Sequence, residues 1–433
     1  MHAAAPVLGS VLLLMAAICY VRMPIGMLLT LLGVAGYALL DGPANALSML
    51  GNEFWGTFSN AGLTVVPLFV LMGQICFHSG LSGRLYQGIA AWIGHRRGGI
   101  AVATVGACGA FAAICGSNTA TAATMSVVSL PEMRRYGYQP VFASGVIAAG
   151  TTLGAVIPPS VVAIVLGIQT GLSIKKLFMG GVLPGLMLLG LFIATIVWMA
   201  RIRPAWGPAG ARASMRERLA GLPGLLEAAV LFGLVVGGLS CGVFTPTEAG
   251  AAGSALALIL GGARRGLSVK KLIRAFLETM NVSAMIFLLL AGAGCYGKFL
   301  SVSRTPFMVA EWVQGVGIGP FALLLLILLV YLVGGMLMDA LALLLITLPI
   351  FFPLVRDMGY DPLWFSLILL VVTTMGAITP PVGASAYVVA SMGKIPLGEV
   401  FRGTLVFIPA FLLCIAVMLA FPELVLWLPG VVE

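Results

Sequence analysis

A few polar side chains inside long apolar stretches are the residues best placed to do chemistry. Ser117, Asn118 and Thr119 lie together in the segment GSNTATAAT, and Asp339 is the only acid in another long apolar stretch. Hydroxyl, amide and carboxylate oxygens are ligands that hard cations prefer, and an acid within a membrane-type segment is a functional candidate by default. The alternative for Asp339 is a local hydrogen-bonded helix cap. These residue types predict a cation site.

Two segments that contain proline pairs add backbone oxygens to this chemistry. They are TTLGAVIPPS, residues 151–160, and TTMGAITPPV, residues 373–382. Neither can be a continuous helix, because proline lacks an N–H group and disfavours helix at the residue before it. Carbonyls freed by unwinding would be costly in hydrocarbon unless a partner such as Na⁺ binds them. The alternative is a proline kink that neighbouring helices satisfy. The nearby hydroxyls are those of Thr151, Thr152, Thr373, Thr374 and Thr379.

No residues form a catalytic set. The 7 cysteines lie almost entirely in apolar segments, without a CxxC motif or a neighbouring histidine, which indicates packing roles. His, Cys and acidic residues are nowhere grouped at a spacing that would build a nucleophile, base or metal centre. We therefore predict no enzyme and no cofactor, with Na⁺ as a coupling ion.

The composition defines the elements that must position these residues. Of 433 residues, 61% are apolar and 9% are charged, whereas a soluble domain carries roughly 25% charged residues. A crossing needs roughly 20 apolar residues, so the chain predicts an all-α protein that spans a lipid bilayer many times. The first apolar run, residues 6–21, reads as a membrane helix and not as a signal peptide. The net charge of +9 comes from clusters between apolar runs, so no nucleic acid partner is expected.

An internal repeat organises the chain. A shift of 222 residues superposes the segment 131–160 on 353–382 without a gap, including Tyr138 on Tyr360 and both proline pairs. Each half gives the same series of apolar segments, with a doublet followed by a segment broken at its centre. The predicted organisation is a first repeat over residues 1–210 with a hairpin at about 100–130, a cytoplasmic connector at 211–222, and a second repeat over 223–433 with a hairpin at about 320–352.

Each doublet reads as two short arms around a polar tip, which predicts a re-entrant hairpin. The alternative is two ordinary spanning helices. A hairpin makes no net crossing, so five crossings per half would invert the second repeat relative to the first. Threading the chain on this model places 18 of the 23 Lys and Arg residues on one side, which would be cytoplasmic, with both termini periplasmic. Inverted repeats with broken helices are typical of secondary transporters with ligands near the midplane.

Three other features favour structural roles. Glu248, just after Pro246 in FTPTEAG, reads as a helix-start residue. His78 has no evident partner. The segments LSIKKL, from residue 172, and LSVKKL, from residue 267, predict short serine-capped helices along the membrane surface.

The chain resembles the large membrane subunit, DctM-type, of the tripartite ATP-independent periplasmic (TRAP) transporters. The motifs that carry the resemblance are GSNTATAAT, YGYQP followed by TTLGAVIPPS, FTPTEAG, and MDALALLLITLPIFFP followed by ITPPVGAS. The resemblance implies an elevator-type sodium symporter of the bacterial inner membrane. It also implies a small four-helix membrane subunit (DctQ-type), a periplasmic substrate-binding protein (DctP-type) and an organic acid, typically a carboxylate, as substrate.

Two alternatives to this function stay open. The first is a self-sufficient sodium/carboxylate symporter of similar architecture, which would need neither partner. The second is a pore-forming channel, although two inverted hairpins favour alternating access.

The resemblance also implies site residues. The first sodium site would use Ser117 and Asn118 with the carbonyls of Gly154, Ile157 and Pro159. The second would use Gly335 and Asp339 with the carbonyls of Gly376, Thr379 and Pro381. The substrate would lie between the tips, contacting Ser117, Asn118, Thr119, Thr152, Asp339 and Thr374. Asn118 stands where many relatives have a second serine.

Overall fold

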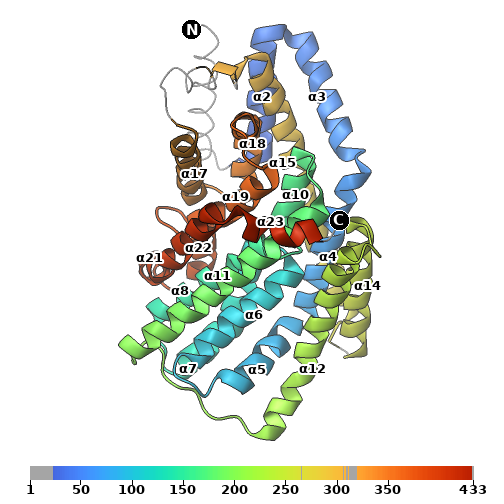
Figure 1. Cartoon of the computed structure of the whole chain (residues 1–433). Helices are drawn as coiled ribbons and strands as arrows, with labels where there is room; N and C mark the ends of the chain where they lie inside the picture. The colour runs from blue at the N-terminus through green and yellow to red at the C-terminus, as the bar shows by residue number, and fades with distance from the viewer. Residues whose placement is uncertain (1–22, 265, 306, 309–310, 312–318, 432–433) are drawn as a thin grey trace.

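All regular structure in the described part of the chain is helical, which confirms the all-α prediction. The computed structural model describes residues 23–431 except 265, 306, 309–310 and 312–318 (Figure 1). Eight helices within that part are long and apolar enough to cross a membrane. The predicted first membrane helix, residues 6–21, lies outside the described residues.

The first half of the chain contributes the helices up to α11. They are α2 (Ile25–Asp41), α3 (Pro43–Phe58), the 3-10 turn η1 (Ala61–Thr64), α4 (Val65–His78), α5 (Leu81–Ile93), α6 (Gly99–Cys115), α7 (Asn118–Arg135), α8 (Pro140–Thr151), α9 (Leu153–Val156), α10 (Val161–Thr170) and α11 (Ile174–Ile202).

The second half contributes a corresponding series. It comprises α12 (Met215–Phe232), the π-helical turn η2 (Gly233–Gly237), α13 (Gly238–Ser240), α14 (Pro246–Ala263), α15 (Val269–Val302), α17 (Pro320–Leu337), α18 (Ala340–Asp357), α19 (Pro362–Gly376), α20 (Ala384–Gly393), α21 (Leu397–Thr404), η3 (Leu405–Phe407), α22 (Ile408–Ala420) and α23 (Pro422–Val431).

Both predicted doublets are helical hairpins. The first consists of α6 and α7, and the second of α17 and α18, which extends a few residues beyond its expected end. The hairpins lie in opposite halves of the molecule, the second above the first in Figure 1. Gly116 at the first turn is buried, as is Gly335 near the end of α17, whereas Asp339 at the second turn is exposed.

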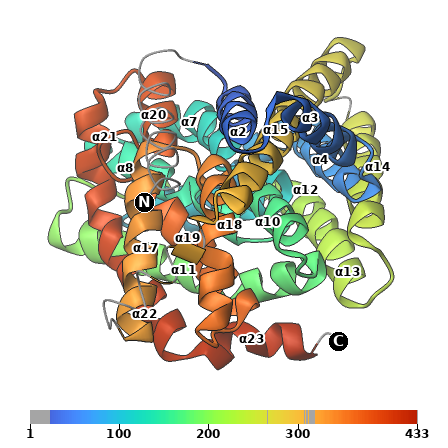
Figure 2. The same cartoon turned by 90° about the horizontal axis from the view of Figure 1, so that it is seen from above.

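Helices related by the 222-residue shift pack against one another across the two halves. α2 lies along α15, and its counterpart α14 lies along α4. After the breaks the same exchange occurs, since α10 packs on α18 and its counterpart α20 packs on α7. Figure 2 shows α3, α4, α12 and α14 toward one side and α7, α8, α17, α19 and α20 toward the other, with α10 and α18 between them. We call α2–α4 with α12–α15 the long-helix group, and α6–α10 with α17–α20 the hairpin group.

The predicted short surface helices are wrong. Ser173 and Ser268 do cap helices, but these are α11 with 29 residues and α15 with 34 residues. Each LSxKKL segment is therefore the first turn of a long helix. The helix-start role of Glu248 is confirmed, because Glu248 forms a capping box with Thr245 at the start of α14.

Three of the described helices, α3, α5 and α23, were not predicted at all. α3 is largely exposed and carries polar residues, so it lacks the apolar run that marks a membrane helix. Its counterpart under the repeat is the first part of α15, where the helix runs on without interruption. In the first half the chain breaks between α3 and α4 at Asn60, whose side chain caps η1. α5 is a short amphipathic helix packed between α6 and α12.

Candidate functional site

The first tip is a sharp turn between α6 and α7. Gly116 ends α6 in the left-handed region, at φ 62°, where glycine pays no steric penalty. Ser117 then caps α7, because its hydroxyl accepts a hydrogen bond from Ala120 N. Its carbonyl also accepts the hydroxyl of Thr121 at 2.7 Å. The polar residues of GSNTATAAT thus begin the second arm, as predicted.

The first tip packs directly on the first break. Gly116 O accepts a hydrogen bond from Val161 N, at the start of α10, at 3.2 Å. A Cβ at Gly116 would lie 2.7 Å from Pro159 O, and one at Gly154 would lie 3.1 Å from Asn118 Oδ1. The structure therefore brings Asn118, Gly154 and Pro159 to one place, as the predicted first sodium site requires.

Asn118 Oδ1 is buried and accepts no hydrogen bond from any described residue. Such an acceptor is costly, by about 1–3 kcal/mol, unless something binds it. The carbonyl of Gly154 lacks its usual helical donor as well, because the residue four positions on is Pro158. The Asn118 amide oxygen therefore lies beside Gly154 without a donor, and the Gly154 carbonyl lacks its helical donor. Amide and carbonyl oxygens are hard donors of the kind that Na⁺ takes.

The second tip places an acid where the first places a serine. Asp339 corresponds to Ser117 under the 222-residue shift, and each is the N-cap of its second arm. The Asp339 carboxylate accepts a hydrogen bond from Leu341 N at 3.1 Å, so Asp339 caps α18 as the helix-cap alternative predicted. The side chain is exposed and forms no salt bridge with any described residue.

The second tip also packs on its break. A Cβ at Gly376 would lie 2.6 Å from the carbonyl carbon of Gly335, the tightest approach between a hairpin and a broken segment. Met336 O accepts hydrogen bonds from Val382 N at 3.2 Å and Gly383 N at 3.1 Å. Each hairpin tip is therefore held against the break of its own repeat.

Carbonyls of the second break have more protein partners than the sequence suggested. Gly376 O accepts a hydrogen bond from Thr379 N at 3.0 Å, and Ile378 O accepts one from the hydroxyl of Thr404 at 2.8 Å. These two carbonyls therefore fit the alternative of a proline kink whose freed carbonyls accept hydrogen bonds from the protein. The carbonyl of Thr379 remains beside Gly383, 3.1 Å from where a Cβ would stand. Pro381 is exposed.

The predicted threonine ligands point into the protein. Thr152 and Thr374 are fully buried, and their hydroxyls donate to the carbonyls of Ala149 and Val371 on their own helices. Each hydroxyl keeps lone pairs that can accept, although neither borders a described cavity. Thr119, by contrast, is exposed beside the first tip. Ile157 is buried within the first break.

Ion pairs bring together cations that the threading placed on one side. Glu227 on α12, only 6% exposed, binds Arg84 Nη2 and Arg264 Nε, each at 2.8 Å. Arg134 donates a hydrogen bond to Gly393 O, and the next residue, Lys394, is another cation predicted on the cytoplasmic side. These contacts join segments from both repeats, as a common side requires. The sequence offered no signal for Glu227 as their bridge.

His78 has a partner that sequence reasoning missed. Its Nε2 lies 3.0 Å from Glu278 Oε2, which joins the end of α4 to α15. The two residues are far apart in the chain, and no local pattern marks the pair.

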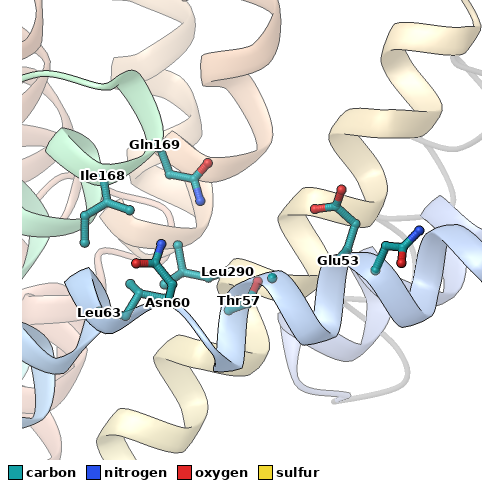
Figure 3. A pocket seen from close by; sticks show the side chains of 9 residues that line it. Glu53, Thr57, Asn60, Leu63, Ile168, Gln169 and Leu290 are labelled. Atoms are coloured by element: carbon teal, nitrogen blue, oxygen red, sulfur yellow. The ribbon is translucent and has the colours of Figure 1, made fainter.

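A polar cavity of about 180 Å³ lies away from both tips, where α3 and η1 meet α10 and α15 (Figure 3). Asn60 and Gln169 point toward the same space in Figure 3. Glu53 also lines it and lies 3.9 Å from Lys298. None of the predicted site residues lines this cavity. The candidate ion ligands lie instead in close backbone contacts between the tips and the breaks.

Comparison with known families gives one match over nearly the whole chain. The family described as "Tripartite ATP-independent periplasmic transporter, DctM component" matches residues 12–424. A Pseudomonas aeruginosa protein, "C4-dicarboxylate TRAP transporter large permease protein DctM", is 34% identical over 92% of this chain and 93% of its own length. The Vibrio cholerae "Sialic acid TRAP transporter large permease protein SiaM" is 29% identical over 95% of both chains. An ectoine/5-hydroxyectoine permease of Ruegeria pomeroyi is 30% identical over 91% of this chain and 92% of its own.

A solved structure shares the fold. The Alcanivorax borkumensis YdaH transporter, described as having an unusual topology, superposes with a TM-score of 0.64 over 88% of this chain and 89% of that one. The sequence identity is 17%, so this likeness speaks for the architecture alone.

Proposed function

The chain belongs to the DctM family of tripartite ATP-independent periplasmic transporters, as a large permease subunit, and from this premise we propose that it imports an organic acid by sodium symport. The relatives are named for C4-dicarboxylate, sialic acid and ectoine, which supports an organic acid as the substrate class. The proposed location is the bacterial inner membrane, with both termini periplasmic.

The observation that carries sodium coupling is the meeting of Asn118 with Gly154. A buried amide oxygen without a donor lies beside Gly154, whose carbonyl is deprived of its helical partner by Pro158. Burying these two oxygens without hydrogen-bond donors is unfavourable unless a cation binds them. We propose Na⁺ at this position, and a second Na⁺ at the corresponding contact of Gly335 with Gly376, beside Asp339.

The substrate is proposed to lie between the two tips. The first turn of α7, with its free N–H groups, offers partial positive charge to a carboxylate. Bound sodium ions would add positive charge on both sides. Ser117, Asn118, Thr119 and Asp339 would line this space, with Thr152 and Thr374 behind them.

The proposed transport cycle is an elevator motion. The hairpin group carries both candidate ion sites, while the long-helix group beside it holds none of the predicted ligands (Figure 2). The first group would move against the second with its ions and substrate. A small four-helix subunit of DctQ type would extend the stationary group, and a DctP-type binding protein would deliver substrate from the periplasm.

The direct test is uptake by vesicles that contain this chain with its two partner proteins. We expect uptake under an inward sodium gradient and none under a proton gradient alone. Uptake driven equally by protons without sodium would contradict the ion assignment and move attention to the exposed carboxyl of Asp339.

A further inference from the structure

A cavity far from the tips combines positive charge with an apolar wall. It has a volume of about 530 Å³ and lies between the α5–α6 turn and the end of α11. Arg96, Arg97 and Arg201 line it together with aliphatic residues that include Ile193 and Val197. Neither the sodium sites nor the substrate space uses any of these residues.

The cavity is built by fixed backbone contacts. Gly98 N donates to Gly207 O and Gly210 N donates to Gly94 O, each at 2.9 Å, so the loop after α11 is fastened to the α5–α6 turn. A Cβ at Gly207 would lie 3.2 Å from Gly98 Cα, which shows how closely these two loops approach. The space is therefore part of the fold and not a gap between loose loops.

The helix α11 presents a mixed face to the cavity. Ile193, Val197 and Arg201 are spaced by four residues, so they lie one above the other along the helix. The two aliphatic residues are half-buried, while the arginine at the end of the row is exposed. The row thus leads from an apolar wall to a positive charge.

The positive charge of the cavity is not neutralised within the described chain. None of its three arginines forms a salt bridge to a described acid. The acid nearest in sequence to this end of α11, Glu217, is engaged at the start of α12 by Ser214. The ligand that suits this site is an anion.

Exposed tryptophans place the cavity at the level of a membrane surface. Trp92 on α5 is 40% exposed and Trp198 on α11 is 61% exposed. Tryptophan gathers where hydrocarbon meets headgroups, because its ring is apolar and its N–H is polar. From Trp198 toward its start, α11 exposes residues such as Leu186, as a lipid-facing helix does.

We propose that this cavity binds one anionic glycerophospholipid, with its phosphate at Arg96, Arg97 and Arg201 and one acyl chain along Val102, Ile193 and Val197. A free phosphate ion would leave the aliphatic wall unused, whereas a phospholipid matches both parts. The bound lipid would bridge the first arm of the first hairpin to α11, and so would join a moving element to its neighbour if the proposed elevator motion holds.

The test is lipid retention by the purified full-length chain in detergent, measured by native mass spectrometry during titration with phosphatidylglycerol or phosphatidylcholine of the same acyl chains. We expect one phosphatidylglycerol to be retained at least about tenfold more strongly than phosphatidylcholine. The triple variant Arg96→Gln, Arg97→Gln, Arg201→Gln should abolish this preference, because each basic residue near a lipid surface contributes roughly fivefold. The matched control removes the same charge with Arg212→Gln, Arg216→Gln and Arg402→Gln, none of which lines the cavity.

A second variant tests the apolar wall without changing the charge. Val197→Trp should fill the cavity and lower phosphatidylglycerol retention while the melting temperature stays near that of the unmodified chain. Equal retention by the cavity triple variant and the control triple variant would overturn the proposal. So would displacement of the lipid by millimolar inorganic phosphate, because it would show an anion site with no acyl-chain contribution.

Discussion

Replacement of Gly376 by alanine tests the contact between the second tip and its break. The added Cβ would stand 2.6 Å from the carbonyl carbon of Gly335 and 2.9 Å from Leu332 O, whereas ordinary contact begins at 3.4 Å. Both neighbours are backbone atoms, which cannot rotate away. The hairpin must therefore shift from the break, and the proposed second ion site would widen with it.

The corresponding replacement in the first repeat, Gly154→Ala, creates a less severe steric clash. In Gly154→Ala the nearest atoms are Asn118 Oδ1 at 3.1 Å and the carbonyl carbon of Ser117 at 3.2 Å. The neighbours need to yield by only a few tenths of an ångström. Overpacking of tight sites costs about 1–3 kcal/mol, and about 1.4 kcal/mol is tenfold in affinity. We expect Gly376→Ala to raise the sodium concentration for half-maximal uptake about 5- to 100-fold, and Gly154→Ala less than about fivefold.

The assay is sodium-dependent uptake by vesicles with both partner proteins. The matched control is Gly190→Ala on α11, where a Cβ meets nothing within 4 Å. A melting temperature in detergent separates loss of ion affinity from misfolding, and Gly335→Ala, whose closest neighbour would be Thr373 O at 2.9 Å, repeats the test at the same contact. A sodium requirement that is unchanged in Gly376→Ala, relative to the Gly190→Ala control, would refute the reasoning.

Three further predictions follow from single contacts. Asn118→Ala should raise the sodium concentration for half-maximal uptake severalfold or more, because losing a ligand costs about 1–3 kcal/mol of binding free energy. Asn118→Ser keeps a side-chain oxygen and should raise that concentration less. Equal increases in the two variants would contradict a ligand role. In a cysteine-free background, an impermeant thiol reagent should reach Ser117→Cys from the cytoplasm and Asp339→Cys from the periplasm, and labelling of both from one face only, in every transport state, would reject the inverted hairpins. Glu227→Gln should lower the free energy of unfolding by about 1–2 kcal/mol and the melting temperature by a few degrees, a modest loss because its partner arginines are 30% and 49% exposed. Glu132→Gln is the control, and it should have no effect because Glu132 belongs to an exposed pair at 3.6 Å. A melting temperature equal to that of Glu132→Gln would show that the Glu227 bridge adds nothing.

The tips and breaks could be predicted because their signals are local. Pro158 and Pro159 forbid a continuous helix whatever the surroundings, and Ser117 marks a helix start by its side-chain chemistry. The pairing of each tip with the break of its own repeat came from the family resemblance, and the repeat placed the same series of elements in both halves.

Other features were outside the reach of local patterns. Ser173 marks where a helix begins but carries no information about how far it continues, which is why the two LSxKKL segments were expected to be separate short helices. α3 is polar and exposed, and it forms through its packing on α2 and α15 and not through an apolar run. The partners of Glu227 and His78 come from distant segments, so only the folded chain reveals them. The hydrogen bonds that Gly376 and Ile378 carbonyls accept likewise depend on tertiary placement.

Reconstitution tests the central claim most directly. The purified chain is placed in vesicles under an inward sodium gradient, first alone, then with the four-helix subunit, and finally with a substrate-loaded binding protein as well. The account predicts no uptake of organic acid until both partners are present. Rapid sodium-driven uptake by the chain alone would contradict dependence on partners and identify a self-sufficient symporter.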